Sequence, residues 1–211
     1  MIDELAFKTG ALSQYLDNSK FSAESRTRLI ASLFSGVPRD VFTQTARETP
    51  LTQGAIETVV GLRKLGYRVG VVTDSFFVAS EIARRRVFAD FSIAYVMRFR
   101  NDKATGEVTL NQAMTHPQGC DEHRICKLNV LRHLTGHAGF ASKDVIAVGD
   151  GENDICLLRA VPLSFAFQPK SGNVRAAARY VIDDSLADLL GVVPQAEMSD
   201  REQKTDLLVV A

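Results

Sequence analysis

One ten-residue segment constrains the fold of this chain more than any other: Val145-Ile-Ala-Val-Gly-Asp-Gly-Glu-Asn-Asp154. Its first four residues are apolar and predict a strand that is buried on both faces, as in parallel sheets. The glycines that follow permit a tight turn, which delivers Asp150 and Asp154 to one edge of the sheet. Two carboxylates there supply the hard oxygen ligands that Mg²⁺ prefers. An aspartate that caps a helix would give the same pattern, so the segment alone leaves both interpretations open.

Strands and helices alternate along most of the chain. This alternation indicates an α/β fold with a doubly wound, Rossmann-like parallel sheet. Residues 1–48 differ, because they predict three short helices and no strand. We therefore divide the chain into a small N-terminal helical cap (1–48), an α/β core (49–192) and a charged C-terminal tail (193–211). The apolar runs predict strands at 67–72, 92–100, 107–110, 145–148, 163–167 and 180–182.

Two further segments place polar groups where such a sheet binds ligands, beyond the carboxyl ends of its strands. Thr73-Asp74-Ser75 follows the strand predicted at 67–72 and precedes a helix, whose positive N-terminal end favours a phosphate. Lys127 lies on a helix predicted at 121–134, between apolar neighbours that would shelter it. Each signal is weak alone, since a threonine before a helix is usually a cap and a helical lysine is usually solvated.

The charge balance limits the partners. Lys and Arg number 25, as do Asp and Glu, so the formal net charge is zero. This balance argues against nucleic acid or an anionic membrane surface, and the sequence has no apolar run of the ~20 residues that a membrane helix needs. The start lacks the pattern of a signal peptide, and three cysteines without a CxxC pair fit a reducing cytoplasm. We expect a cytoplasmic protein that acts on a small molecule, with the oligomeric state open and a homodimer among the alternatives.

Together these segments resemble the haloacid dehalogenase superfamily of phosphotransferases. The segment 149–154 is similar to the family's acidic motif, Thr73 to its Ser/Thr motif and Lys127 to its lysine motif. Within the superfamily, the chain looks most like the phosphoserine phosphatases. Two N-terminal patterns carry that likeness: Ile2-Asp-Glu-Leu-Ala6 with Gly10, and Phe21 with Arg26 and Arg28.

The resemblance implies Mg²⁺-dependent hydrolysis of phosphoserine or phosphohomoserine through an aspartyl phosphate, with a function in serine biosynthesis. It implies that Asp150 holds Mg²⁺. Three residues would be catalytic, namely Thr73, Lys127 and Asp154, the last acting directly or by orienting the lysine. Six residues would bind substrate: Arg26, Thr73, Asp74, Ser75, Lys127 and Asn153. Arg26 would bind the substrate carboxylate from the helical cap, which would close over the site.

One motif of the family has no counterpart. Its Asp-x-Asp-x-Thr/Ser segment supplies the nucleophile and the general acid/base, whereas this sequence nowhere has two aspartates two places apart. In the family that segment ends the central strand of the sheet. We consider three explanations: the nucleophile lies upstream of Met1, the product is a truncated and inactive protein that binds a phosphorylated ligand or partner, or residues 207–210 fill the vacant strand. The first is the working hypothesis.

Four residues are spaced loosely like zinc ligands: His116, Cys120, His123 and Cys126. Zinc sites favour tighter paired spacings, and residues 117–119 indicate an ordinary loop. On spacing alone we do not expect zinc.

Overall fold

The computed structural model of the chain describes residues 2–10, 22–115, 117, 119–138, 141–197 and 207–210. The chain forms two compact units, each made of several segments. The first unit contains Met1–Pro50, Thr73–Ala83 and Ser92–Asn111. The second unit contains Leu51–Val72, Arg84–Phe91 and Gln112–Ala211.

The first unit combines short helices with the ends of strands. Helix α3 begins after Ser22, whose hydroxyl accepts a hydrogen bond from the Ser25 amide at 3.3 Å, the usual arrangement of an N-cap. Strands β2 and β3 are joined by a tight turn at Asn101 and Asp102, both of which have positive φ. The helices and strands with residues in this unit are α1 (Ile2–Lys8), α3 (Ala23–Leu33), α4 (Arg39–Glu48), β1 (Tyr67–Phe76), α6 (Phe77–Val87), β2 (Phe91–Arg100) and β3 (Lys103–Thr109).

Four phenylalanines pack together within the first unit. Phe34 and Phe42 come from the helical segment, Phe76 ends β1 and Phe99 lies in β2. Their rings meet edge to face, with centroids 5.4–6.2 Å apart. Such pairs add roughly 0.5–1.5 kcal/mol each beyond the burial of their area. The aromatic core therefore holds the helical segment of this unit against its strands.

The second unit contains the parallel part of the sheet. It includes residues 67–72 of β1 and residues 84–87 of α6. Its other helices and strands are α5 (Ala55–Lys64), η1 (Gln112–Thr115), α7 (Lys127–Ala138), η2 (Ser142–Asp144), β4 (Val145–Gly149), η3 (Glu152–Asp154), α8 (Ile155–Ala160), β5 (Leu163–Phe167), α9 (Gly172–Ala177), β6 (Tyr180–Ile182), η4 (Leu186–Asp188), α10 (Leu189–Glu197) and β7 (Leu207–Val210). Strand β4 is buried from Val145 to Val148, as the apolar run predicts.

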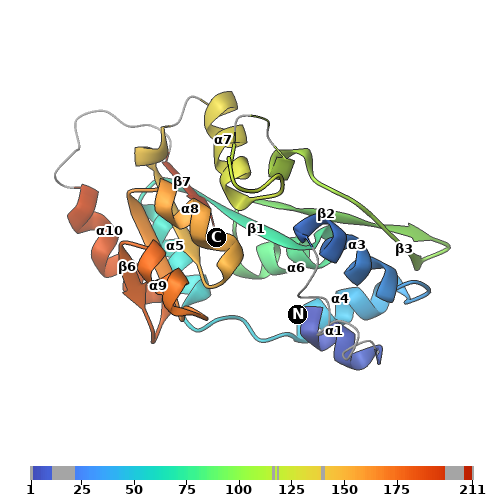
Figure 1. Ribbon diagram of the computed structural model, residues 1–211. Helices are drawn as coiled ribbons and strands as arrows, with labels where there is room; N and C mark the ends of the chain where they lie inside the picture. The colour runs from blue at the N-terminus through green and yellow to red at the C-terminus, as the bar shows by residue number, and fades with distance from the viewer. Residues whose placement is uncertain are drawn as a thin grey trace. The chain divides into compact units, whose positions relative to one another are not determined.

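Both faces of this part of the sheet are covered by helices. Because neighbouring residues of a strand point to opposite faces, Ile146 and Val148 share one face. They pack in a cluster with residues of α5 and α10, among them Leu62 and Val193. Helix α8 contacts β4 and β5, and α7 packs beside α8 (Figure 1). Fold class is thereby confirmed as an α/β fold with a parallel sheet between helices.

The strand order is β3-β2-β1-β7-β4-β5-β6. The last strand in the sequence, β7, thus lies in the centre, parallel to both neighbours. Val209 is in register with Val69 of β1 and with Ile146 of β4. Of the three explanations for the missing first strand, the one in which residues 207–210 occupy its position describes this structure.

Several boundaries differ from those that the sequence predicts. Strand β1 extends to Phe76, so Thr73, Asp74 and Ser75 lie inside the strand and not in a loop after it. Helix α7 begins at Lys127 and not at residue 121. The expected tail 193–211 is also different, because residues 193–197 belong to α10 and residues 207–210 form β7. Patterns of apolar residues do not reveal which strands pair with one another, since strand order depends on contacts distant in sequence.

None of the helices in the described part of the chain is long and apolar enough to cross a bilayer.

We predict that deletion of residues 207–211 strongly destabilises the second unit. It exposes the inner edges of β1 and β4, and each buried backbone group left unpaired costs about 1–3 kcal/mol out of a total of about 5–15 kcal/mol. Urea unfolding followed by circular dichroism should show a lower midpoint or loss of the cooperative transition. Lys143→Ala, at an exposed position just before β4, is the control and should stay within about 0.5 kcal/mol of the parent. An unchanged midpoint for the deletion would show that β7 is not needed.

Candidate active site

The loop between β4 and α8 is built around the side chain of Asp154. This residue is fully buried, and its Oδ2 accepts hydrogen bonds from the backbone amides of Asp150 and Gly151, each at 3.1 Å. The loop folds back so tightly that a Cβ at Gly149 would lie 2.4 Å from the Cβ of Asp154. Only glycine fits at that position, which explains the Gly-Asp-Gly pattern that follows the strand.

The second oxygen of Asp154 binds Lys127. The distance from Lys127 Nζ to Asp154 Oδ1 is 2.6 Å, and the two side chains are only 11% and 1% exposed. Lys127 is the first residue of α7, where an unpaired ammonium would be opposed by the positive end of the helix. The carboxylate offsets that repulsion and fixes the position of the amine. Asp154 thus joins the β4 loop to the start of α7.

Asp150 is the more accessible carboxylate of the pair. Its side chain is 49% exposed at the carboxyl end of β4, and its Oδ2 lies 2.6 Å from Nζ of Lys170, which is 72% exposed. The backbone amide of Lys170 also donates to the Asp150 carbonyl oxygen at 2.9 Å. In the same region Ser171, the N-cap of α9, donates its hydroxyl proton to Glu152. The loop after β5 therefore supports the loop after β4.

Sequence reasoning missed Lys170. It follows the end of β5 by three residues, and Asp150 follows the end of β4 by one. The rule that locates Asp150, that polar groups at the carboxyl ends of parallel strands gather at one edge, also applies to Lys170. The position of Lys170 after a strand could be seen in the sequence, but the residue belongs to no recognisable motif.

The residues at this edge fit a magnesium ion. Mg²⁺ binds through one or two carboxylates and keeps water or phosphate oxygens for its other positions. Both oxygens of Asp154 are occupied by Lys127 and by backbone amides, whereas Asp150 presents a half-exposed carboxylate. Asp150 is thus the residue here that would hold the ion. Lys170 would compete with the ion for this carboxylate, but an exposed ion pair of this kind is weak.

The predicted residues divide between the two units. Lys127, Asp150 and Asp154 come together in the second unit, and exposed Asn153 lies in the same loop. The other four belong to the first unit: Arg26, Thr73, Asp74 and Ser75. Thr73 Oγ1 accepts a hydrogen bond from the Ser75 amide at 3.1 Å. Ser75 Oγ is buried and has no hydrogen-bond partner among the residues that the structure describes.

Arg26 lies in α3 and is half-buried. Arg28, two residues later, pairs with Glu24 one turn before it, with Nη2 and Oε1 3.0 Å apart. Within the described ranges Arg26 itself forms no ion pair. Of these two arginines, Arg28 therefore already has an acidic partner among the described residues and Arg26 does not.

The chain is similar to known phosphatases over most of its length. Residues 122–192 match the family of haloacid dehalogenase-like hydrolases. The phosphoserine phosphatase SerB2 of Mycobacterium tuberculosis is 32% identical over 194 residues, and the phosphoserine phosphatase of Streptomyces coelicolor is 30% identical over 194 residues. These alignments cover 89% and 90% of this chain but only 44% of each relative. The chain thus spans less than half the length of these two relatives.

A solved structure gives the same likeness at the level of the fold. A phosphoserine phosphatase in its apo form superposes with a TM-score of 0.76 at 26% identity, covering 90% of each chain. Because the agreement covers nine tenths of both chains, it concerns the arrangement of helices and strands and not one motif.

We predict a large, coupled loss of stability when the buried ion pair is broken. Asp154→Ala leaves the Lys127 ammonium and two backbone amides without their partner, which should cost about 3–5 kcal/mol. Lys127→Met should be less harmful in a background that already carries Asp154→Leu than in the parent. A double-mutant cycle by urea unfolding measures this coupling.

The control for that cycle is the exposed pair of Arg175 and Asp183, whose side chains are 54% and 59% exposed at an N–O distance of 3.0 Å. Arg175→Ala should cost at most about 1 kcal/mol. If Asp154→Ala cost no more than this control, Asp154 would not be the residue that organises the loop.

Proposed function

The chain is a haloacid dehalogenase-like protein of the phosphoserine phosphatase type, and we propose that it hydrolyses a small phosphomonoester, phosphoserine or phosphohomoserine. The observation that carries the proposal is the buried pair of Lys127 and Asp154 beside the half-exposed Asp150, all at the carboxyl end of β4. A charged amine held rigidly next to a metal-binding carboxylate suits phosphoryl transfer, in which negative charge spreads over the phosphoryl oxygens.

Each residue has a distinct part in this proposal. Asp150 would hold Mg²⁺, which neutralises charge on the phosphoryl oxygens when bound. Lys127 would donate hydrogen bonds to those oxygens, and Asp154 would act as a positioning residue by holding the lysine. Thr73, Asn153 and Ser75 would donate further hydrogen bonds, a part for which the unpartnered hydroxyl of Ser75 is suited. Three free cysteines support a reducing compartment, and we propose the cytoplasm.

The reaction requires a nucleophile, and the proposal places it upstream of Met1. An aspartyl-phosphate mechanism needs one carboxylate to attack phosphorus and a second to move a proton. In the family that the chain resembles, both belong to an Asp-x-Asp strand, a pattern that this sequence does not contain. Removal of a nucleophile typically slows an enzyme by about 10⁴–10⁶.

We predict that protein made with the codons upstream of Met1 releases phosphate from phosphoserine in the presence of Mg²⁺ and stops when EDTA is added. Asp150→Asn should reduce kcat/KM by at least about 100-fold, because loss of a charge-stabilising group at the transition state costs at least about 2.7 kcal/mol. The chain that begins at Met1 should be slower by about 10⁴–10⁶. Equal rates for the two lengths would disprove an upstream nucleophile.

We predict that Arg26 selects for the carboxylate of the substrate. Arg26→Met should raise KM for phosphoserine about 10- to 100-fold, since a hydrogen bond to a charged group is worth about 1.5–3 kcal/mol. KM for p-nitrophenyl phosphate, which has no carboxylate, should not change. Arg28→Met is the matched control, because Arg28 already pairs with Glu24. A similar rise in KM for both substrates would assign Arg26 a structural part only.

The alternative function is a catalytically inactive protein that binds a phosphorylated ligand or partner. The position of β7 favours it, because this strand fills the centre of the sheet and carries four apolar residues and no carboxylate. Isothermal titration of the chain from Met1 with phosphoserine distinguishes the two functions when combined with the assay above. Binding to both lengths without turnover by either would establish the inactive binder.

A further inference from the structure

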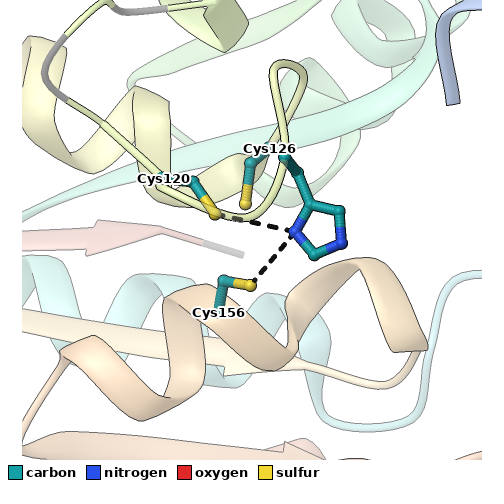
Figure 2. A group of neighbouring side chains, drawn as sticks. Cys120, Cys126 and Cys156 are labelled. Atoms are coloured by element: carbon teal, nitrogen blue, oxygen red, sulfur yellow. Dashed lines mark hydrogen bonds between the residues drawn. The ribbon is translucent and has the colours of Figure 1, made fainter.

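Three cysteines and a histidine meet in the second unit, away from any part assigned to them above. Cys120, His123 and Cys126 come from the loop that precedes α7, and Cys156 comes from α8. Figure 2 shows the three sulfur atoms directed toward one another, with dashed lines from the imidazole to two of them. Their ligand atoms all lie within 4.8 Å of one another.

The distances within the cluster match a tetrahedral metal site. His123 Nδ1 lies 3.6 Å from Cys120 Sγ and 3.5 Å from Cys156 Sγ. In tetrahedral zinc coordination, with Zn–S about 2.3 Å and Zn–N about 2.0–2.1 Å, the nitrogen and a sulfur are separated by about 3.6 Å. The two distances in the cluster are therefore compatible with coordination of both sulfurs and the nitrogen to one ion.

The loop is held in place by a buried asparagine. Asn129 Oδ1 accepts a hydrogen bond from the Cys120 amide at 2.6 Å, and its Nδ2 donates to the carbonyl oxygens of Met114 and Arg124 at 2.7 and 2.9 Å. The approach is so close that a Cβ at Gly119 would lie 1.8 Å from Asn129 Oδ1. The ligand-bearing loop is thus shaped by protein contacts, which reduces the conformational entropy that metal binding would have to overcome.

We propose that Cys120, His123, Cys126 and Cys156 bind one zinc ion in a closed site. Four protein ligands leave no position for water or substrate, which is the arrangement of structural zinc and not of catalytic zinc. Three thiolates select zinc over Mg²⁺, which prefers oxygen.

The zinc site would stabilise the ion pair of Lys127 and Asp154, because a zinc ligand lies close in sequence to each of these two residues. Cys126 directly precedes Lys127, and Cys156 follows Asp154 by two residues. An ion bound to both cysteines connects the start of α7 to the start of α8, the two helices that carry the buried pair. Zinc would thereby hold Lys127 and Asp154 in position. The site itself stands apart from the proposed hydrolysis, since it binds zinc whether or not the chain turns over a substrate.

The loose spacing of His116, Cys120, His123 and Cys126 did not favour zinc, and Cys156 was not part of that set. Cys156 lies 30 residues after Cys126 and reaches the loop only because α8 packs beside α7. His116, the fourth residue of the spacing argument, lies outside the described residues. The structure thus adds Cys156 to three of the four residues in that set.

The test is the metal content of the full chain purified under reducing conditions without added chelator. We expect about one zinc per chain by mass spectrometry of the metal, retained through gel filtration. Replacement by Co²⁺ should produce the visible absorption bands of a tetrahedral thiolate site. Cys156→Ser should lose the stoichiometric zinc, whereas Arg159→Ala, an exposed change on the same helix, should retain it.

Two results would overturn the proposal. One is a folded chain that takes up no zinc and gives no tetrahedral Co²⁺ spectrum when the metal is supplied. The other is a disulfide between two of the three cysteines in protein isolated without reductant. Because the Co²⁺ spectrum is read on the parent chain, it remains decisive if Cys156→Ser fails to fold. Neither readout depends on phosphatase activity, so failure of the zinc site and failure of the proposed function are separate outcomes.

Discussion

The buried ion pair between Lys127 and Asp154 is the interaction on which the candidate site depends. A carboxylate this deeply buried is tolerated only when its charge is compensated, and here the partners are one ammonium and two backbone amides. These bonds fix the turn after β4, and the conformation of that turn sets the direction of Asp150. The pair contributes to position more than to stability, because apolar residues of similar volume would often hold such a core equally well. Its retention in an apolar environment is therefore better explained by the position it gives to the lysine than by stability.

Much of this arrangement can be predicted from the sequence. The strand at 145–148, its Gly-Asp-Gly turn and the acidic pair could be predicted because they are local: burial sets the apolar run, and the fold-back onto Asp154 requires glycine. The parallel α/β class follows from the alternation of strands and helices. The buried state of Lys127 was indicated by its apolar neighbours, and its partner Asp154 by the family resemblance.

Contacts between distant segments were harder to predict. Lys170 reaches Asp150 from a different strand end, and Cys156 reaches the loop before α7 from a different helix. No periodicity or motif spacing in the sequence predicts either contact, because each depends on which helices and strands become neighbours in the fold. The start of α7 was also predicted too early, since residues 121–126 carry ligand-type side chains and turn instead of continuing the helix. A sequence pattern that fails at a cluster of cysteine and histidine is itself informative, because locally unfavourable segments often mark functional sites.

The centre of the sheet links the folding problem to the chemical one. Strands β1 and β4 each present an inner edge, and β7 satisfies both with its own backbone groups. In the family that the chain resembles, the strand that carries the nucleophile lies between the same two neighbours. One edge can pair with only one strand, so β7 and a nucleophile strand cannot occupy this position at the same time. A catalytically complete protein would have to displace residues 207–210 from the sheet, because a chain with β7 in place has no room for a nucleophile strand between β1 and β4. The choice between phosphatase and binding protein therefore depends on which strand fills the centre of the sheet, whereas the bonds that position Lys127 and Asp154 come from the β4 loop and α7 and not from β7.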